Sequence, residues 1–342
     1  MKQKERVLLK MIGFTLIFGV LGGCARGDAA NSAPINATNN TKLLTTTPFI
    51  SNIQTPVSPS TPAPVLITSH ISGLAVYSFW VSQDPIVSQI FLKDLDTGVV
   101  TQLTNTGNNS DPIWSPDGSQ IMFLSWTKEN SFDIYLMDRD GSHQRQIVAS
   151  PAMEIMTDWS PDGNKIAFVS NKDGNDEIYV IDLQTQDTVS LTNNLGIHSG
   201  TAKWSPGSPK WSTDGKYIAF ASTTGISGTS QVFIMNADGT NIRPMTDYDL
   251  YYDDSPVWCP DDSCIVFERD QPKLMLLDLT SKAVTPFLEG IFPSERVELG
   301  LARSSRRGYM TFNVDGMFYA MNMKSREIFP LDIKANDLSL FP

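Results

Sequence analysis

Apolar and polar positions alternate in short segments that return at a near-regular spacing along the chain. In four places an Ile-x-Phe segment follows the tight-turn string Trp-Ser-Pro-Asp-Gly or a weakened copy of it. Proline presets φ for the first corner of such a turn and glycine takes the left-handed position that closes it. The Ile and Phe fall on one buried face of the strand that follows. The strings occupy 114–118, 159–163, 211–215 and 258–262, and the phenylalanine nine residues after each tryptophan is Phe123, Phe168, Phe220 or Phe267.

A second pair of strands completes each unit. Segments such as 134–138 and 178–182 lead into a further turn and a last short strand, often marked by Leu-Thr. Two more units, around Phe79 and Phe312, keep the ladder without the tryptophan. A period near 45 residues with four short strands in each unit is typical of a β-propeller. The pattern therefore predicts an all-β fold, a six-bladed β-propeller of four-stranded antiparallel blades, over residues 65–342.

Two segments compete to close the ring. The tail at 336–342 resembles residues 108–114 and could supply the missing inner strand of the first blade. The stretch at 65–68 could do the same from the N-terminal side. We favour closure by the tail.

The string WSPDGxxIxF, followed by IYxxDxxG and Leu-Thr, resembles the repeat of the TolB-type propellers, a six-bladed family. The resemblance runs from about residue 66 to the C-terminus and rests on several independent units. It implies the fold rather than a task, because this repeat occurs in many unrelated bacterial proteins. TolB itself is a soluble periplasmic protein with an α/β domain ahead of its propeller. That domain is not found here, which disfavours a role in the Tol system.

Residues 1–23 predict a secretory signal. Four basic residues up to Lys10 precede an apolar run at 11–21, which is too short to span a bilayer. The run ends in Leu-Gly-Gly-Cys, which resembles the bacterial lipobox. The resemblance implies cleavage before Cys24 and a lipid on its sulfur; the alternative is an ordinary signal peptide with a chance cysteine. Two or more acyl chains, such as palmitate, give stable anchoring.

Residues 24–64 predict a disordered tether, because Asn, Ser, Thr, Ala and Pro dominate and only Arg26, Asp28 and Lys42 are charged. Forty such residues reach roughly 35 Å by random-coil scaling. We expect an extracytoplasmic protein that is lipid-anchored to a bacterial membrane. With alanine at position 25, the enterobacterial sorting rule gives the periplasmic side of the outer membrane in a diderm. In a monoderm the place is the outer face of the plasma membrane.

The net charge limits the classes of binding partner, and two of the cysteines can form a disulfide. The chain has 26 Lys and Arg against 37 Asp and Glu, a net charge of −11, and loss of residues 1–23 leaves 22 against 36. Such a surface repels nucleic acid and anionic headgroups. We therefore expect no nucleic-acid partner and attachment to the membrane through the lipid alone. We also expect a monomer. Cys259 and Cys264 flank a tight turn, where they can form a disulfide in an oxidising compartment; the alternative is two free thiols.

The residues of common catalytic and metal sites are scarce. His70, His143 and His198 have no partner at metal-ligand spacing, and no Gly-x-Ser-x-Gly elbow or phosphate loop occurs. The loop at 171–177 superficially resembles a calcium loop but lacks the length and the distal glutamate of an EF-hand. We interpret it as a turn, with a cation site as the alternative. The sequence predicts no enzyme activity, no cofactor and no metal site.

One loop stands out as a contact surface. Residues 247–254 connect two blades at the rim of the channel mouth, where tyrosines and carboxylates can stack on sugars or receive a basic peptide. The alternative is packing between blades. Arg303, Arg306 and Arg307 occupy the turn of the sixth unit, either as a degenerate turn with solvated charges or as an anion or partner contact. The candidate rim residues are Tyr248, Tyr251, Tyr252, Asp253 and Asp254.

These observations favour a non-catalytic, lipid-anchored propeller that acts as an interaction scaffold for another protein of the cell envelope. A first alternative is a glycan- or peptide-binding module that uses the rim loop at 247–254. A second alternative is a propeller hydrolase or lyase, which requires several carboxylates that converge on a metal in the channel.

Overall fold

The structure is a computed structural model. It describes residues 64–67, 71–128, 131–148, 150–192, 205–223, 229–247, 251–270, 273–292, 297–298 and 308–341. Chain contacts divide the protein into two units, Met1–Thr61 and Pro62–Pro342, and the described residues all belong to the second. The predicted signal at 1–23 and almost all of the predicted tether at 24–64 lie outside them.

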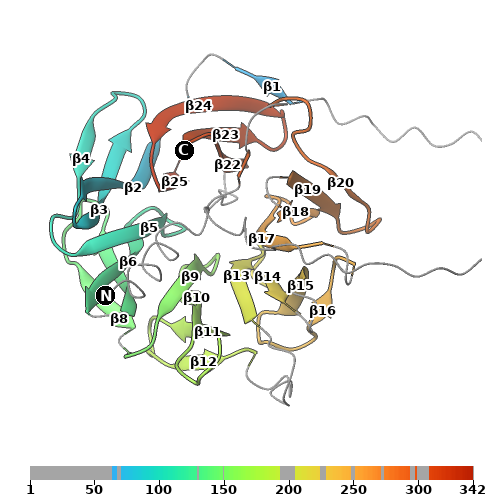
Figure 1. Cartoon of the computed structure of the whole chain (residues 1–342), viewed down its shortest axis with the longest axis horizontal. Helices are drawn as coiled ribbons and strands as arrows, with labels where there is room; N and C mark the ends of the chain where they lie inside the picture. Colours follow the sequence, from blue (N-terminus) through green and yellow to red (C-terminus); the bar gives the residue numbers. More distant parts are fainter. Residues whose placement is uncertain are drawn as a thin grey trace, which may run out of the picture. The chain divides into compact units, whose positions relative to one another are not determined.

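Six sheets surround a common centre, and each contains four antiparallel strands (Figure 1). This confirms the predicted six-bladed propeller. Blade 1 comprises β2 (Leu74–Gln83), β3 (Ile86–Asp94), β4 (Val100–Gln102) and β25 (Asp337–Phe341). Blades 2 and 3 comprise β5 (Asn108–Trp114), β6 (Gln120–Lys128), β7 (Ser131–Asp138), β8 (Arg145–Val148), β9 (Glu154–Trp159), β10 (Lys165–Ser170), β11 (Glu177–Asp182) and β12 (Thr188–Ser190). Blades 4 to 6 comprise β13 (Ser205–Trp211), β14 (Tyr217–Thr223), β15 (Ser230–Asn236), β16 (Arg243–Pro244), β17 (Asp253–Trp258), β18 (Cys264–Arg269), β19 (Lys273–Asp278), β20 (Val284–Pro286), β21 (Val297–Glu298), β22 (Tyr309–Val314), β23 (Met317–Asn322) and β24 (Glu327–Lys334).

The C-terminal strand closes the ring. β25 pairs antiparallel with β2, with Leu74 opposite Phe341 and Ser78 opposite Asp337, so the prediction of closure by the tail is confirmed. The competing segment takes a different place. β1 (Val65–Leu66) pairs parallel with β24 and adds a fifth strand to the outer edge of blade 6.

The core lies between adjacent blades. Ala167 and Val169 of blade 3, for example, share one buried cluster with Trp211, Ile218 and Phe220 of blade 4. Large aromatic and branched side chains fill the wedge between neighbouring sheets, as a radial arrangement of blades requires. The tryptophan of each turn string therefore serves packing rather than chemistry.

The second strand of a blade carries an aromatic ring that faces a ring on the third strand. Phe168 and Tyr179 lie 5.7 Å apart between centroids, and Phe220 and Phe233 lie 5.4 Å apart. In blade 1 the matching ring is Tyr77, which stacks on Phe91, and not Phe79 as the spacing indicated. Residues two apart share a face of a strand, so only the pairing with the third strand distinguishes the two aromatics. Phe79 is 46% exposed.

The Ser-Pro-Asp-Gly turn is held by its own side chains. In blade 3 the Ser160 hydroxyl donates to Asp162 Oδ1 at 2.6 Å and accepts the Lys165 N–H at 2.8 Å. The Gly163 N–H donates to the Ser160 carbonyl at 2.9 Å, and Gly163 has φ of 76°. A residue with a side chain resists this left-handed conformation. The serine, the aspartate and the glycine of the string thus each have a local structural reason.

The Leu-Thr pair at the end of a unit also has a structural reason. The hydroxyls of Thr104, Thr192 and Thr246 accept the N–H of a fully buried residue inside the third strand, namely Ile90, Ile178 and Val232 respectively. This N–H lies beyond the short fourth strand, so the threonine satisfies a buried donor that would otherwise be costly.

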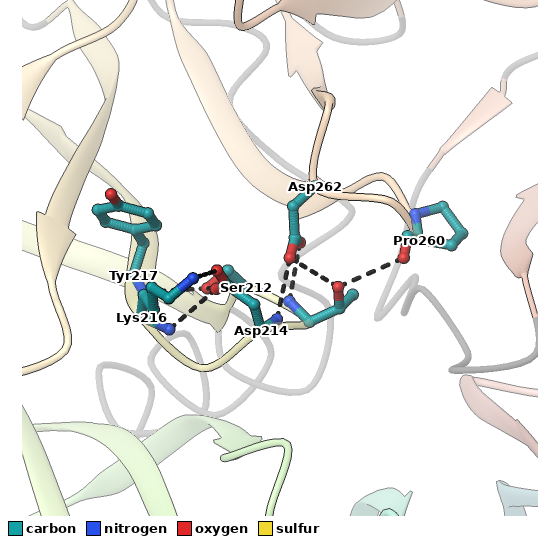
Figure 2. A network of polar contacts seen from close by, with 7 residues as sticks. Ser212, Asp214, Lys216, Tyr217, Pro260 and Asp262 are labelled. Carbon is teal, nitrogen blue, oxygen red and sulfur yellow. Dashed lines mark hydrogen bonds and ion pairs between the residues drawn. The ribbon is translucent and has the colours of Figure 1, made fainter.

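In blades 3, 4 and 5 the turn packs against the turn of the blade before it. At one such junction two residues depart from the turn string, and each departure compensates for the other. A Cβ on Gly215 would lie 3.0 Å from Pro161 of the preceding turn. At the next junction the proline is replaced by Thr213 and the glycine by Asp262, which keeps the positive φ, at 56°. The Asp262 carboxylate accepts from Thr213 N–H at 2.8 Å, Thr213 Oγ1 at 2.7 Å and Asp214 N–H at 2.9 Å (Figure 2). A proline at position 213 would have no N–H to donate. The hydrogen bonds from Thr213 to Asp262 therefore take the place of the glycine–proline contact found at the preceding junction.

A buried carboxyl lies at the closure. Asp337, 6% exposed, accepts from Ser78 N–H at 3.2 Å, Ser78 Oγ at 2.7 Å and Asp111 N–H at 3.1 Å. Burial, with a contribution from the nearby Asp111 carboxylate, raises the pKa of Asp337 to about 7. The hydrogen bonds join the closing strand to both β2 and β5.

We expect Gly118→Ala to destabilise the propeller more than Gly163→Ala, by about 1–3 kcal/mol. Both positions have similar positive φ, 72° and 76°, so both variants carry the same backbone strain. At Gly118 the new methyl would lie 2.5 Å from Cζ of Phe341 in the closing strand, and at Gly163 it would lie 3.7 Å from Pro116. Urea denaturation measures the difference.

The added variant Phe341→Ala tests the cause. It should remove most of the extra loss from Gly118→Ala, because residues in contact are not additive. Equal stabilities for the two glycine variants would contradict the position of the closing strand.

We expect the stability contributed by Asp337 to fall as pH rises. The pKa of this group is about 7 in the folded state and about 4 in the unfolded chain. Its contribution is therefore fully present below about pH 4 and is lost as pH rises through about 7, with a slope of up to about 1.4 kcal/mol per pH unit. Urea titrations of wild type and Asp337→Asn from pH 4 to 8 should show the variant gaining relative stability with pH. Parallel curves would refute the assignment.

Candidate rim site

Strand polarity gives the propeller two different faces. The Trp-Ser-Pro-Asp-Gly turns join first to second strands, so they lie at one end of the blades, which we name the turn face. The second-to-third-strand hairpins and the blade-to-blade connections lie at the opposite end, which we name the rim face. The candidate loop precedes β17, which puts Tyr251 and Tyr252 at the rim face.

A buried ion pair anchors this part of the rim. Arg269, the last residue of β18, donates from Nε and Nη2 to the two carboxylate oxygens of Asp253 at 2.7 and 2.8 Å. Its guanidinium carbon lies 4.1 Å from the ring centroid of Tyr251 and 5.3 Å from that of Phe267. Hydrogen bonding to Asp253, which is fully buried, raises the pKa of Arg269. Removing one member of such a pair costs about 3–5 kcal/mol of stability. Because the Asp253 carboxylate is buried against Arg269, it helps to support Tyr251 and does not face solvent.

The two tyrosines of the described loop are exposed. Tyr251 and Tyr252 are 37% and 39% exposed. The backbone of Tyr252 is fixed by exchange with Asp270: its N–H donates to the Asp270 carboxylate and its carbonyl accepts the Asp270 N–H, both at 2.9 Å. Partial burial and the Asp254 charge raise the pKa of Tyr252 to about 12, so its hydroxyl stays protonated at neutral pH. The loop therefore presents two held aromatic side chains to solvent.

Asp254 links neighbouring inner strands. Its carboxylate accepts from Ser255 N–H at 2.6 Å and from the hydroxyl of Ser208 in β13 at 3.4 Å. Burial raises the pKa of Asp254. Of the candidate rim residues, Asp253 is thus buried in an ion pair within blade 5 and Asp254 joins blade 5 to blade 4. Tyr251 and Tyr252 remain available for contact.

A second aromatic surface on the rim face was missed by sequence reasoning. Phe79, Trp80 and Val81, near the end of β2, are 46%, 39% and 49% exposed. Strand polarity puts this end of β2 at the rim face. The signal in the sequence was the run Phe-Trp-Val itself, because three consecutive apolar residues break the alternation that a half-buried strand requires. Arg269 was also missed, since an arginine at a strand end shows its partner only in three dimensions.

A polar cleft of about 570 Å³ lies on the turn face between blades 3 and 4. Asp162, Asp214 and Asp238 line it with Lys165 and Trp211. Each of these aspartates is hydrogen-bonded within its own turn, and these bonds, with Lys216 foremost at Asp214, lower the pKa of all three. The carboxylates are ionised at neutral pH and belong to the turns.

The described parts of the chain hold no metal-binding group of three or more His, Cys, Asp or Glu side chains. His143 pairs with Asp138 at 2.7 Å in an exposed turn. In the loop at 171–177, Asp173 accepts from the Tyr179 hydroxyl at 2.5 Å and Glu177 accepts from the Thr192 hydroxyl. These carboxylates have structural roles, which supports the interpretation of the loop as a turn. No helix among the residues seen in the structure is long and apolar enough to cross a membrane.

Several candidate residues lie outside the described ranges. They are the lipidation residue Cys24, the histidines His70 and His198, the rim residue Tyr248, and the three arginines Arg303, Arg306 and Arg307. Their roles stay predictions.

Cys259 and Cys264 are joined by a disulfide in the structure, with 5.2 Å between their Cα atoms. The Cys259 N–H donates to the Cys264 carbonyl at 2.8 Å, so the bond spans the base of the turn that carries Asp262. Its loop is short, so its effect on the unfolded chain is modest. The bond stiffens the turn that reaches to blade 4.

A family model decides the relationship of this chain to known proteins. The model of the TolB beta propeller domain matches residues 62–208 and 156–290, which together span more than half of the chain. The chain belongs to the TolB β-propeller family. This confirms the resemblance that the turn strings and the strand ladder indicated.

Two curated relatives have matching segments. A protein TolB homolog of Chlorobium luteolum is 32% identical over 89 residues, which is 26% of this chain and 20% of that protein. A Tol-Pal system protein TolB of Francisella tularensis subsp. mediasiatica is 28% identical over 116 residues, 34% of this chain and 25% of that protein. The chain thus matches a quarter or less of the length of these relatives.

The solved structure of TolB from Acinetobacter baumannii has the same fold. It superposes with a TM-score of 0.59 and 19% sequence identity, over 80% of this chain and 67% of that one. At this identity the likeness concerns the fold alone.

We expect the unreduced protein to show no alkylation at Cys259 or Cys264, because the two sulfurs are bonded to each other. Mass spectrometry after treatment with iodoacetamide measures this, and reduction before alkylation should add two labels. Labelling of both thiols without reduction would rule the bond out.

Proposed function

We propose that this protein is a lipid-anchored adaptor of the bacterial cell envelope. Its propeller binds another envelope protein and catalyses no reaction. The observation that carries the proposal is the exposed aromatic surface of the rim face, where Tyr251, Tyr252, Phe79 and Trp80 are each more than a third exposed. Aromatic side chains of this kind are enriched at protein interfaces and dominate their binding energy.

The family supports a role in the envelope. The Francisella relative is a protein of the Tol-Pal system, and the match to it covers a quarter of that protein. We therefore carry over the binding of an envelope partner, and no particular component of that system. The net charge of −11 argues in addition against a nucleic-acid partner, and we propose that the protein acts as a monomer.

The lipid anchor and tether give the adaptor its reach. Cys24 follows the lipobox-like string, and residues 24–64 have the composition of a flexible linker. A flexible linker of this length has a root-mean-square reach of roughly 35 Å, so the propeller can search for a partner while it stays localised at the membrane. We propose an extracytoplasmic location for the protein.

The chemistry of the described residues supports a non-catalytic role. The buried carboxylates of Asp337 and Glu177 accept hydrogen bonds from Ser78 and Thr192, and no metal-binding cluster occurs among the described residues. A catalytic site needs several groups that converge on one reacting position.

Crosslinking of the membrane-anchored protein in its own cells tests the proposal. We expect one dominant envelope protein to co-purify, and we expect it to be lost or strongly reduced with Cys24→Ala, which lacks the acylated sulfur. Identification by mass spectrometry provides the readout. Correct localisation without any crosslinked partner would contradict the adaptor role.

A second candidate function is favoured by one observation. The Arg269 guanidinium lies over the Tyr251 ring, 4.1 Å from its centroid, and Tyr251 is 37% exposed. A supported, exposed ring of this kind can serve as a platform for a sugar or an extended peptide. If no protein partner is found, glycan and peptide arrays probed with wild type and with Tyr251→Ser test this second function. Binding that the variant loses would establish the platform, and binding that the variant keeps would refute it.

A further inference from the structure

The inner strand of blade 1 is too short to cover its neighbour. In blades 3, 4 and 5 the first strand pairs with the second strand to its last residue, at Ser170, Thr223 and Arg269. In blade 1, β25 pairs with β2 only from Leu74 to Ser78. The remaining half of β2, from Phe79 to Gln83, keeps β3 on one side, and no strand of the described residues pairs with it on the other. We name this part of β2 the free edge.

Backbone groups on the free edge point outward. The Ser78 N–H donates to Asp337 Oδ1 and its carbonyl accepts from the Asn336 N–H, so the backbone of Ser78 faces away from β3. Trp80 lies two residues further along and opposite Ser88, whose own N–H is directed away from β2, to Asn108. Because backbone polarity alternates along a strand, the N–H and C=O of Trp80 face the same way as those of Ser78. Nothing in the described part of the chain pairs with them.

Side chains beside the free edge suit an added strand. Phe79 and Trp80 project to opposite faces of the sheet, and both are exposed. A strand laid along this edge would place its side chains against an aromatic ring on each face. Main-chain hydrogen bonds then supply affinity and the flanking apolar residues supply selectivity, which is how strand addition works in peptide recognition.

Charge and geometry indicate which occupant fits. The hairpin from Phe79 to Leu92 has a single charged residue, Asp84, and the whole chain has a net charge of −11, which favours a neutral or basic segment. The register shift between Trp80 and Ser82 bends the edge and limits pairing to a short stretch, as bulges do where edge-to-edge association is avoided. A second copy of this chain is therefore a poor occupant.

A short strand is sufficient for such pairing in this protein. β1 has two residues, and it is held on blade 6 by the Val65 N–H to the Arg326 carbonyl at 3.0 Å and the Ile67 N–H to the Ile328 carbonyl at 2.7 Å. This outer-edge contact shows strand addition within the same propeller.

We propose that the free edge of β2 binds an extended, neutral or basic segment of a partner protein as an additional strand of blade 1. The identity of the partner rests on the proposed adaptor function, and the mode of binding does not. Phe79, Trp80 and Val81 form the apolar border of this site, and the Trp80 backbone forms its hydrogen-bonding centre.

Two substitutions at one position separate strand addition from simple apolar contact. Trp80→Ala removes the indole and keeps the N–H, whereas Trp80→Pro removes both. The N–H faces the free edge, where proline is tolerated in a strand. The probe is a nine-residue peptide of alternating valine and threonine with a lysine at each end, titrated by fluorescence anisotropy against the detergent-solubilised full chain. A peptide with a central proline is the control probe.

We expect the peptide to bind wild type, and Trp80→Pro to bind about tenfold more weakly than Trp80→Ala. Hydrogen exchange of wild type provides a readout that does not depend on either variant folding: the Trp80 amide should exchange fast alone and become protected with the peptide. Equal binding by the two folded variants, or no protection at Trp80, would overturn the proposal. A peptide-induced dimer would also overturn it, in favour of self-pairing.

The same variants distinguish this proposal from the adaptor function. Loss of the crosslinked envelope protein in Trp80→Pro, beyond the loss in Trp80→Ala, supports both. If the crosslinked partner is unaffected by either variant and the peptide does not bind, the adaptor function is supported and strand addition at the free edge is refuted. If the peptide binds and protects the Trp80 amide but no partner is crosslinked in cells, strand addition at the free edge is supported and the adaptor function is refuted.

Discussion

The pairing of β25 with β2 is the interaction on which the rest of the structure depends. It joins Ser78 and Asp337, which are 259 positions apart, and it supplies the first blade with its inner strand. Each blade buries both faces against neighbours, so an open ring would expose two apolar surfaces. Asp337 and Phe341 extend the closure to β5 and to the Gly118 turn. Residues 337–341 thus complete the packing of blade 1 against both of its neighbours.

The turn face shows how a repeat tolerates change. A glycine on one turn packs against a proline on the turn before it, at Gly163 with Pro116 and at Gly215 with Pro161. At Thr213 the proline is lost, which creates an N–H and a hydroxyl that need a partner. Asp262, in place of the glycine, provides that partner while it keeps the positive φ. The two departures are a matched pair, and the disulfide between Cys259 and Cys264 spans the same turn.

The two faces of the ring differ in how completely their polar groups are satisfied. On the turn face the carboxylates are used within and between turns, and their pKa values are lowered accordingly. On the rim face Arg269, paired with Asp253, lies over the ring of the exposed Tyr251, and β2 extends past the end of its closing strand. Exposed aromatics and an unpaired edge are the features that recognition surfaces need. The interaction role proposed for this protein therefore belongs to the rim face.

The sequence by itself determined the repeat and the number of blades, because turn chemistry and strand alternation are local and recur in each unit. It also placed the two cysteines at opposite sides of one turn. For ring closure it favoured the tail over the stretch at 65–68, and the pairing of β25 with β2 decided between them. Only the tertiary structure decided that Tyr77 and not Phe79 joins the aromatic ladder, since the two share a face and differ only in their partner on β3. It also decided that Asp253 is buried against Arg269 and that β2 is left half uncovered. These outcomes depend on which strands meet and where each ends, and such long-range pairing leaves no periodic trace in the chain.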